Sequence, residues 1–150
     1  MKLQKSTLLA LYSVLEFAGH PGRQISAAEI AGKYDVSTHH LSKVLRELGR
    51  AGLLESVRGV GGGYRFTGNP KRITLMDVIE LFEDISGRAA KGSTAINGID
   101  GALASVLKEI DETAKATFRS ITLDTMLMLA RRAAANPVAG FDERRTAPSA

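Results

Sequence analysis

The stretch that decides the fold is Ser56-Val57-Arg58-Gly59-Val60-Gly61-Gly62-Gly63-Tyr64. It predicts a β-hairpin, with strands at about 53–58 and 64–67, whose tip is almost free of side chains. Because glycine lacks a Cβ, such a tip lets the backbone pass close to another surface, where Arg58 supplies a positive charge. Tyr64 and Phe66 alternate along the second strand and are expected to pin the hairpin to the core.

Two short helices joined by a tight turn are predicted immediately before the hairpin. Ser26-Ala27-Ala28-Glu29 is a capping box that starts the first helix, and Asp35-Val36 forms the turn. Ser37 caps the second helix, which runs to about Gly49 or Ala51. The apolar residues at helical spacing are Ile30, Ala31 and Tyr34 in the first helix and Leu41, Val44, Leu45 and Leu48 in the second. This order predicts a winged helix-turn-helix, and the fold class is mainly α with a small β component.

Further helices are predicted on both sides of this unit. One spans about residues 6–18, with Leu8, Leu11, Leu15 and Ala18 at helical spacing. Thr74 caps another, which carries Val78, Ile79 and Phe82.

The second half of the chain has a different composition. Residues 85–101 are rich in glycine, serine and alanine and are expected to form a loop. An amphipathic helix follows over 103–118, and a shorter helix restarts at about Ile121. The tail 136–150 is expected to be disordered.

The chain has 150 residues and no cysteine. This excludes disulfides, thiolate zinc sites and cysteine-ligated iron–sulfur clusters in this chain. No apolar run reaches the roughly 18 residues that a membrane span needs, and no signal peptide is recognisable. We therefore expect a cytoplasmic protein without a membrane partner.

The net charge of +4 is unevenly distributed. Residues 1–72 hold eleven Lys and Arg against five Asp and Glu, whereas residues 73–150 hold nine against eleven. The first half therefore carries the field that attracts a polyanion, although a modest basic excess is also common in soluble domains.

The second helix of the helix-turn-helix offers a candidate surface for DNA. Opposite its leucine stripe lie short donors, an imidazole and two cations, and the N-terminal residues of such a helix reach base edges in the major groove. We predict base readout by Thr38, His39, Ser42 and Lys43, and phosphate contacts by Arg46 and Arg50. Arg58 is expected to enter a minor groove. The remaining candidate contacts are Lys5, Ser26, Ser37, Gly59, Gly61 and Gly62. The alternative is an ordinary solvated helix face.

Metal, nucleotide and catalytic sites are disfavoured. His39 and His40 point about 100° apart on a helix, so they are poorly placed to ligate one ion. Residues 59–63 lack the Gly-Lys-Ser/Thr ending of a phosphate-binding loop. Adjacent acidic pairs such as Asp111-Glu112 diverge on a helix, and Ser26, Ser37 and Thr74 are helix caps, so no enzyme is expected.

The helix-turn-helix, the stretch from Gly52 to Tyr64 and the stretch Ile73-Thr74-Leu75-Met76-Asp77-Val78-Ile79 together resemble the Rrf2 (BadM-type) family of bacterial transcription regulators. The resemblance is specific over about residues 1–85 and loose from 100 to 135. Well-known members sense iron–sulfur status, nitric oxide or cysteine supply. The family implies a homodimer, paired through the long C-terminal helix, whose two winged heads bind a partly palindromic operator.

The helix at 103–118 suits that dimer role, since a lone chain would leave its apolar stripe partly exposed. The expected interface residues are Leu103, Val106, Leu107, Ile110, Ala114 and Phe118. The alternative is that this stripe packs on the chain's own first or fourth helix, and both can hold together.

The sequence departs from the family in one respect. Many members place three cluster-ligating cysteines in the loop after the fourth helix, but residues 88–100 contain neither cysteine nor histidine. Replacement of native cysteines by alanine would leave the same pattern. We expect a natural branch without a cluster or other cofactor, which responds to a small molecule or a protein partner.

These features predict a dimeric, sequence-specific DNA-binding regulator, most simply a repressor. The expected organisation is a DNA-binding domain over 1–84, a loop and candidate sensing region over 85–101, and dimerisation helices over 102–135. The alternative is a protein-interaction module that keeps the fold without specific DNA binding; a winged helix that binds RNA is a weaker variant.

Overall fold

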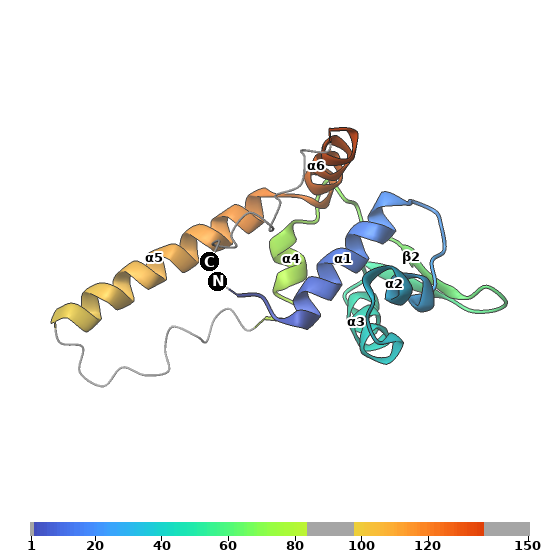
Figure 1. Ribbon diagram of the computed structural model, residues 1–150, viewed down its shortest axis with the longest axis horizontal. Coiled ribbons are helices and arrows are strands. Elements are labelled where there is room, and N and C mark those ends of the chain that lie inside the picture. Colours follow the sequence, from blue (N-terminus) through green and yellow to red (C-terminus); the bar gives the residue numbers. More distant parts are fainter. Residues whose placement is uncertain (1, 84–97, 137–150) are drawn as a thin grey trace, which may run out of the picture.

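The computed structural model describes residues 2–83 and 98–136. The first of these ranges forms a head that contains α1 (Lys5–Gly19), α2 (Ala27–Tyr34), α3 (Thr38–Arg50), β1 (Leu54–Val57), β2 (Gly63–Phe66) and α4 (Leu75–Ile79). The second contains α5 (Gly98–Ser120) and α6 (Leu123–Ala135). The order of α2, α3 and an antiparallel hairpin confirms the predicted winged helix-turn-helix (Figure 1).

The helix starts follow the capping signals of the sequence. The Ser26 hydroxyl accepts a hydrogen bond from the Glu29 amide at 3.2 Å while the Glu29 carboxylate accepts from the Ser26 amide at 3.0 Å, which confirms the capping box. Ser37 caps α3, and Thr74 caps α4 in a second reciprocal box with Asp77. Local side-chain hydrogen bonds therefore define where three helices of the head begin.

The core of the head lies where α1 packs against α3, α4 and β2. The predicted stripe of α3 is confirmed, since Leu41, Val44, Leu45 and Leu48 are buried. Tyr64 and Phe66 pack against this core as predicted, and the Tyr64 ring meets Phe17 edge to face at 6.4 Å. Packing in this core sets the position of α3 and the hairpin relative to each other.

The first strand is shorter than the expected 53–58, and the second has the expected length but begins one residue earlier, at Gly63. The register pairs Leu54 with Phe66 and Val57 with Gly63, so β1 ends one residue before Arg58. Arg58 therefore belongs to the tip of the hairpin rather than to its first strand.

The helix α5 begins at Gly98, so residues 98–101 are helical and not part of a loop as expected. An aspartate in the first turn, Asp100, favours the helix start, and alanines follow it, which together outweigh the glycines. The rest of the expected loop and the predicted tail after Asn136 lie outside the described residues. Neither α5 nor any other helix in the described ranges is long and apolar enough to cross a membrane.

The C-terminal end of α5 is attached to the head. The Leu75 amide donates to the Ile121 carbonyl at 2.9 Å, and the Leu123 amide donates to the Ile73 carbonyl at 2.9 Å. The Leu123 side chain is fully buried in the core. From this junction α5 projects away from the head, and the hairpin projects in roughly the opposite direction (Figure 1).

Candidate nucleic-acid interface

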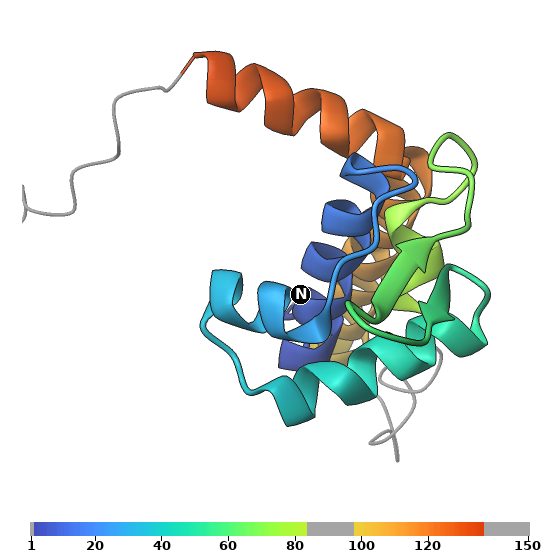
Figure 2. The same ribbon diagram turned by 90° about the vertical axis from the view of Figure 1, so that its right-hand side faces the viewer.

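The outer face of α3 presents the predicted recognition residues. Thr38, His39, Lys43 and Arg46 are exposed, and Ser42 is half-buried. They lie opposite the leucine stripe that packs into the core, because residues three and four apart share a face of a helix. Figure 2 shows α3 along one edge of the head with the hairpin beside it, in agreement with the packing of α3 on β1.

The hydroxyl groups among the predicted residues are partly used within the protein. Ser42 Oγ donates to the Thr38 carbonyl at 2.8 Å, while Ser26 Oγ and Ser37 Oγ accept from amides of the helices that they cap. Because Ser42 already donates its proton to its own helix, its hydroxyl is left as an acceptor toward an outside group. The sequence pattern alone did not reveal this bond.

The cations of the interface fall into two groups. Arg50, at the end of α3, is paired with Glu47 at 2.9 Å. Within residues 2–83 and 98–136, no carboxylate pairs with Lys43, Arg46 or Arg58. A phosphate contact by Arg50 would first have to displace the Glu47 carboxylate, whereas no such displacement from a described carboxylate is needed at the other three cations.

Lys5 lies apart from α3 in the sequence, at the exposed first turn of α1. His39 and His40, although adjacent, have different surroundings: His39 is exposed, and Nε2 of His40 is buried. The described part of the chain contains no group of three or more His, Cys, Asp or Glu side chains that could hold a metal ion.

The wing tip, residues 58–62, is a tight turn with its own geometric needs. The Gly62 amide donates to the Gly59 carbonyl at 2.9 Å, and Gly59 and Gly61 have φ of 117° and 77°. A Cβ on Gly62 would lie 3.0 Å from two backbone carbonyl oxygens. The hairpin itself therefore requires these glycines, independently of any external surface.

The segment between α1 and α2 contributes a residue that the sequence pattern missed. The Gln24 side-chain amide donates to the Gly61 carbonyl, 37 residues away in the sequence. Gln24 and Arg58 also line one open cavity of about 610 Å³, to which Glu55, Ser56, Val57 and Arg65 of the hairpin contribute. No periodicity or motif signals a contact between such distant residues.

The predicted dimer residues divide into two sets. Leu103, Val106, Leu107 and Ile110 are 53–56% exposed, whereas Ala114 and Phe118 are half-buried. Phe118 packs against the core of the head. The C-terminal end of the stripe therefore packs on the chain's own head, whereas the part from Leu103 to Ile110 is exposed, and its pairing with a second protomer stays a prediction.

Comparison with protein families gives one match over most of the chain. Residues 3–128 match the Rrf2 family, described as "Iron-dependent Transcriptional regulator". BadM of Rhodopseudomonas palustris, named as an HTH-type transcriptional regulator, is 54% identical over 127 residues, which cover 85% of this chain and 81% of BadM. The HTH-type transcriptional regulator IscR of Cereibacter sphaeroides is 31% identical over 110 residues, which cover 71% of each chain.

Solved structures have the same fold. CymR of B. subtilis, named as the global cysteine regulator, superposes with a TM-score of 0.70 at 26% identity and covers 86% of this chain and 98% of CymR. T. potens IscR superposes with a TM-score of 0.66 at 27% identity and covers 89% and 90%. These neighbours confirm the winged helix fold with a long C-terminal helix.

The family description names iron, and the donor set of this chain does not fit a cysteine-ligated iron centre. The sequence contains no cysteine, and the segment 84–97 between α4 and α5 contains no histidine. The chain matches the family model and the solved structures although it lacks cysteine, and lacks histidine in this segment. The chain belongs to the Rrf2 family of transcriptional regulators.

Proposed function

We propose that this protein is a homodimeric, sequence-specific DNA-binding regulator that represses transcription from a partly palindromic operator. The observation that carries the proposal is the pair of cationic elements in the head. Lys43 and Arg46 on α3 and Arg58 on the wing have no ion-pair partner among the described residues. Cations held on a helix and a hairpin, and left unneutralised, suit the phosphates and grooves of DNA.

The recognition helix α3 provides sequence readout in this proposal. Thr38, His39 and Lys43 reach base edges, and Ser42 accepts a hydrogen bond from a base or a water, since its proton is already donated to Thr38. Arg46 and Arg50 contact phosphates. The amides at the starts of α2 and α3, beside Ser26 and Ser37, and the exposed Lys5 add backbone contacts that fix the register.

The wing provides the minor-groove contact. Arg58 enters the groove, and the turn at Gly59, Gly61 and Gly62 carries it there with little side-chain bulk. The fully exposed Val60 is the single larger side chain beside it at the tip.

The helix α5 provides the dimer contact, so residues 1–84 bind DNA and residues 98–135 join the protomers. Its 23 residues correspond to a length of about 35 Å. An antiparallel pair of such helices would hold the two heads on the order of one helical turn of DNA apart, which is the spacing of operator half-sites. The exposed stripe from Leu103 to Ile110 supports this pairing.

The effector enters in one of two regions. The first is 85–101, of which residues 98–101 form the start of α5. The second is a cavity of about 400 Å³ between the head and α6, lined by Tyr12, Glu16, Lys33, Tyr34, Leu127 and Arg131 among others. Its volume lies in the range of small-molecule sites. A ligand or protein partner acts by favouring one spacing of the two heads over another.

The test is fluorescence anisotropy of a labelled duplex from the region upstream of the protein's own gene, against a scrambled duplex, across a salt series. We expect preference for the upstream duplex and an affinity that falls steeply with salt, because phosphate contacts release counterions. Equal, weak binding to both duplexes would contradict specific binding at this site and favour a protein-interaction module.

A further inference from the structure

The segment between α1 and α2 is joined to the hairpin by an isolated antiparallel β-bridge between Ile25 and Tyr64. The Ile25 amide donates to the Tyr64 carbonyl and the Tyr64 amide donates to the Ile25 carbonyl, each at 2.9 Å. A Cβ on Gly63 would lie 2.4 Å from the Ile25 carbonyl oxygen, so only glycine permits this approach. The base of the wing is thus held by a segment that lies 37 residues or more before it in the chain.

One side chain extends this contact to the tip. The Gln24 amide donates to the carbonyl of Gly61, the third residue of the turn that closes the wing. Among the described residues, Gln24 is the one side chain that hydrogen-bonds to residues 58–62. Because that turn is rich in glycine, it would otherwise sample many conformations, and each such bond reduces that freedom.

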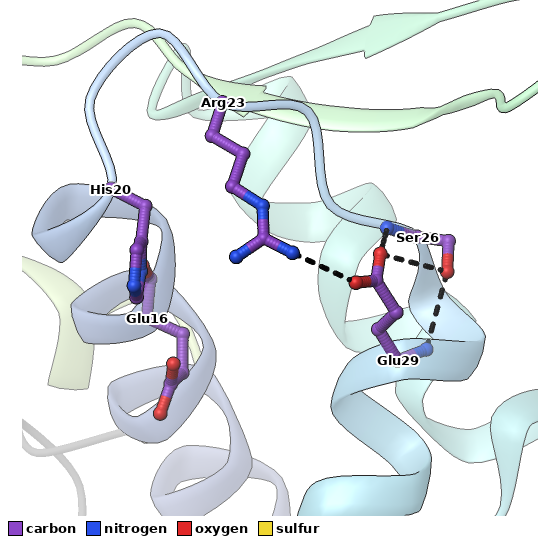
Figure 3. Close-up of polar contacts among 5 residues, drawn as sticks. All are labelled: Glu16, His20, Arg23, Ser26 and Glu29. Atoms are coloured by element: carbon purple, nitrogen blue, oxygen red, sulfur yellow. Dashed lines mark hydrogen bonds and ion pairs between the residues drawn. The ribbon is translucent and has the colours of Figure 1, made fainter.

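The segment that carries Gln24 is itself fixed on α2. Arg23 pairs with Glu29 at 3.2 Å, and the backbone amide of Ser26 donates to the same carboxylate at 3.0 Å (Figure 3). The residues on both sides of Gln24 and Ile25 are therefore tied to one turn of helix. Gln24 thus holds the wing tip from a point that is itself anchored to the helix-turn-helix.

We propose that Gln24 is a positioning residue for DNA binding: it holds the wing tip in the orientation that presents Arg58, without contacting DNA itself. Arg58 lies one residue beyond β1 and belongs to the same tip as Gly61, so restraint of Gly61 restrains Arg58 as well. Gln24 and Arg58 also line the same cavity. This inference rests on the proposed role of the wing. An ordered tip binds more tightly because less conformational freedom is lost in the complex.

The test compares Gln24→Met, which keeps the side-chain length and removes the donor, with Thr67→Val. Thr67 Oγ1 donates to the Gly52 carbonyl at 3.0 Å, so Thr67→Val removes a bond of the same kind at the base of the hairpin. Both variants are measured with and without Arg58→Ala, by anisotropy on the upstream duplex and by ¹⁵N relaxation of the tip amides in the free protein.

We expect Gln24→Met to weaken binding by about three- to tenfold when Arg58 is present and by less than about twofold when it is replaced. Order parameters at Gly61 and Gly62 should fall in Gln24→Met and stay unchanged in Thr67→Val. An equal loss of affinity in both Arg58 backgrounds, an equal loss in Thr67→Val, or unchanged order parameters would each overturn the inference.

The affinity of Arg58→Ala alone distinguishes failure of the proposed function from failure of the positioning role of Gln24. If Arg58→Ala alone leaves affinity unchanged, the wing takes no part in binding and both proposals fall. If Arg58→Ala weakens binding but Gln24→Met does not, only the positioning role is wrong.

Discussion

The apolar residues of α3 and α5 follow the same helical spacing but have opposite surroundings. In α3, Leu41, Val44, Leu45 and Leu48 are at most 2% exposed. In α5, Leu103, Val106, Leu107 and Ile110 repeat that spacing and are at least 53% exposed. The same pattern therefore marks a helix that its own chain covers and a helix that its own chain leaves open. Spacing identifies an apolar face, but not the partner that covers it.

The largest effect is expected from charges placed in the exposed apolar stripe of α5. We expect Leu107→Asp with Ile110→Asp to abolish dimers, because each protomer loses two apolar side chains worth about 1.5–3 kcal/mol each and gains two buried charges. Light scattering over a concentration series measures the oligomeric state. Ser105→Asp, about 200° around the helix from Leu107, is the control and should leave dimers intact. Dimers that persist in the double variant would place the interface elsewhere.

The same leucine-to-alanine substitution, made once in α3 and once in α5, tests the comparison further. Leu45→Ala should lower the free energy of unfolding of the head by about 2–5 kcal/mol, because it leaves a cavity in the core. Leu107→Ala should leave the head intact and act on the dimer dissociation constant. Thermal unfolding at several protein concentrations separates the two, since the melting temperature depends on concentration only where a dimer dissociates. A large, concentration-independent loss in Leu107→Ala would mean that its own chain covers α5.

A smaller effect is expected at the base of the wing. Gly63→Ala should destabilise the protein by about 1–3 kcal/mol, because the new Cβ would meet the Ile25 carbonyl oxygen at 2.4 Å and force the two segments apart. Gly22→Ala is a useful comparison, since nothing lies within 4 Å of its Cβ position and only its φ of 77° is strained. Urea unfolding of both variants gives the difference. Equal losses would show that the close approach at Gly63 is easily relaxed.

A substitution in the wing is expected to change DNA affinity without changing the oligomeric state, which the proposal assigns to α5. Arg58→Ala should weaken operator binding by about 1–3 kcal/mol while leaving the dimer unchanged, because Arg58 lies on the hairpin, which projects away from α5 (Figure 1). Anisotropy and light scattering on the same sample measure both quantities. A change in oligomeric state on loss of Arg58 would contradict this division of roles.

The smallest effect concerns two glutamates, Glu16 in α1 of the head and Glu112 on α5. Burial tends to raise the pKa of Glu16, but hydrogen bonds from Lys33 at 2.5 Å and Tyr34 at 2.6 Å, with the Lys33 charge, hold it below its usual 4.5. Because the folded-state pKa is depressed, this carboxylate stabilises the fold above about pH 4.5, and the contribution is lost as the pH falls further. Glu16→Gln should therefore cost less than about 1 kcal/mol near neutral pH.

The pH series distinguishes the two glutamates. The gap between Glu16→Gln and the native protein should close as the pH falls below about 4.5, as measured by urea unfolding. Glu112, which pairs with Lys115 on the surface of α5, is the control, and Glu112→Gln should leave the stability of the head unchanged. A gap at Glu16 that is independent of pH would show that packing, not charge, is responsible.

The sequence predicted the features that local rules determine. The caps at Ser26, Ser37 and Thr74 and the buried face of α3 follow from hydrogen bonds and spacing within a few residues, and all were confirmed. The glycine-rich tip was located correctly, but its glycines proved to meet the needs of the turn itself.

Contacts between distant residues could not be predicted in the same way. Gln24 meets Gly61, and Leu75 meets Ile121, through bonds that no periodicity encodes. The Ser42 hydroxyl is committed to its own helix, a choice between backbone and outside partners that residue type alone leaves open. The roles of the individual DNA-contacting residues stay predictions.

The backbone pairing at 73–75 and 121–123 has a consequence for how the family can vary. Two hydrogen bonds of 2.9 Å join these two segments, so the chain between Leu75 and Ile121 forms a loop whose two ends are held together. The entropic cost of lengthening such a closed segment grows only slowly with its length. Insertions or replacements between α4 and α5 can therefore be accommodated while the place where α5 leaves the head stays the same. Under the proposed function, this junction would let the candidate sensing region change while the winged head stays the same.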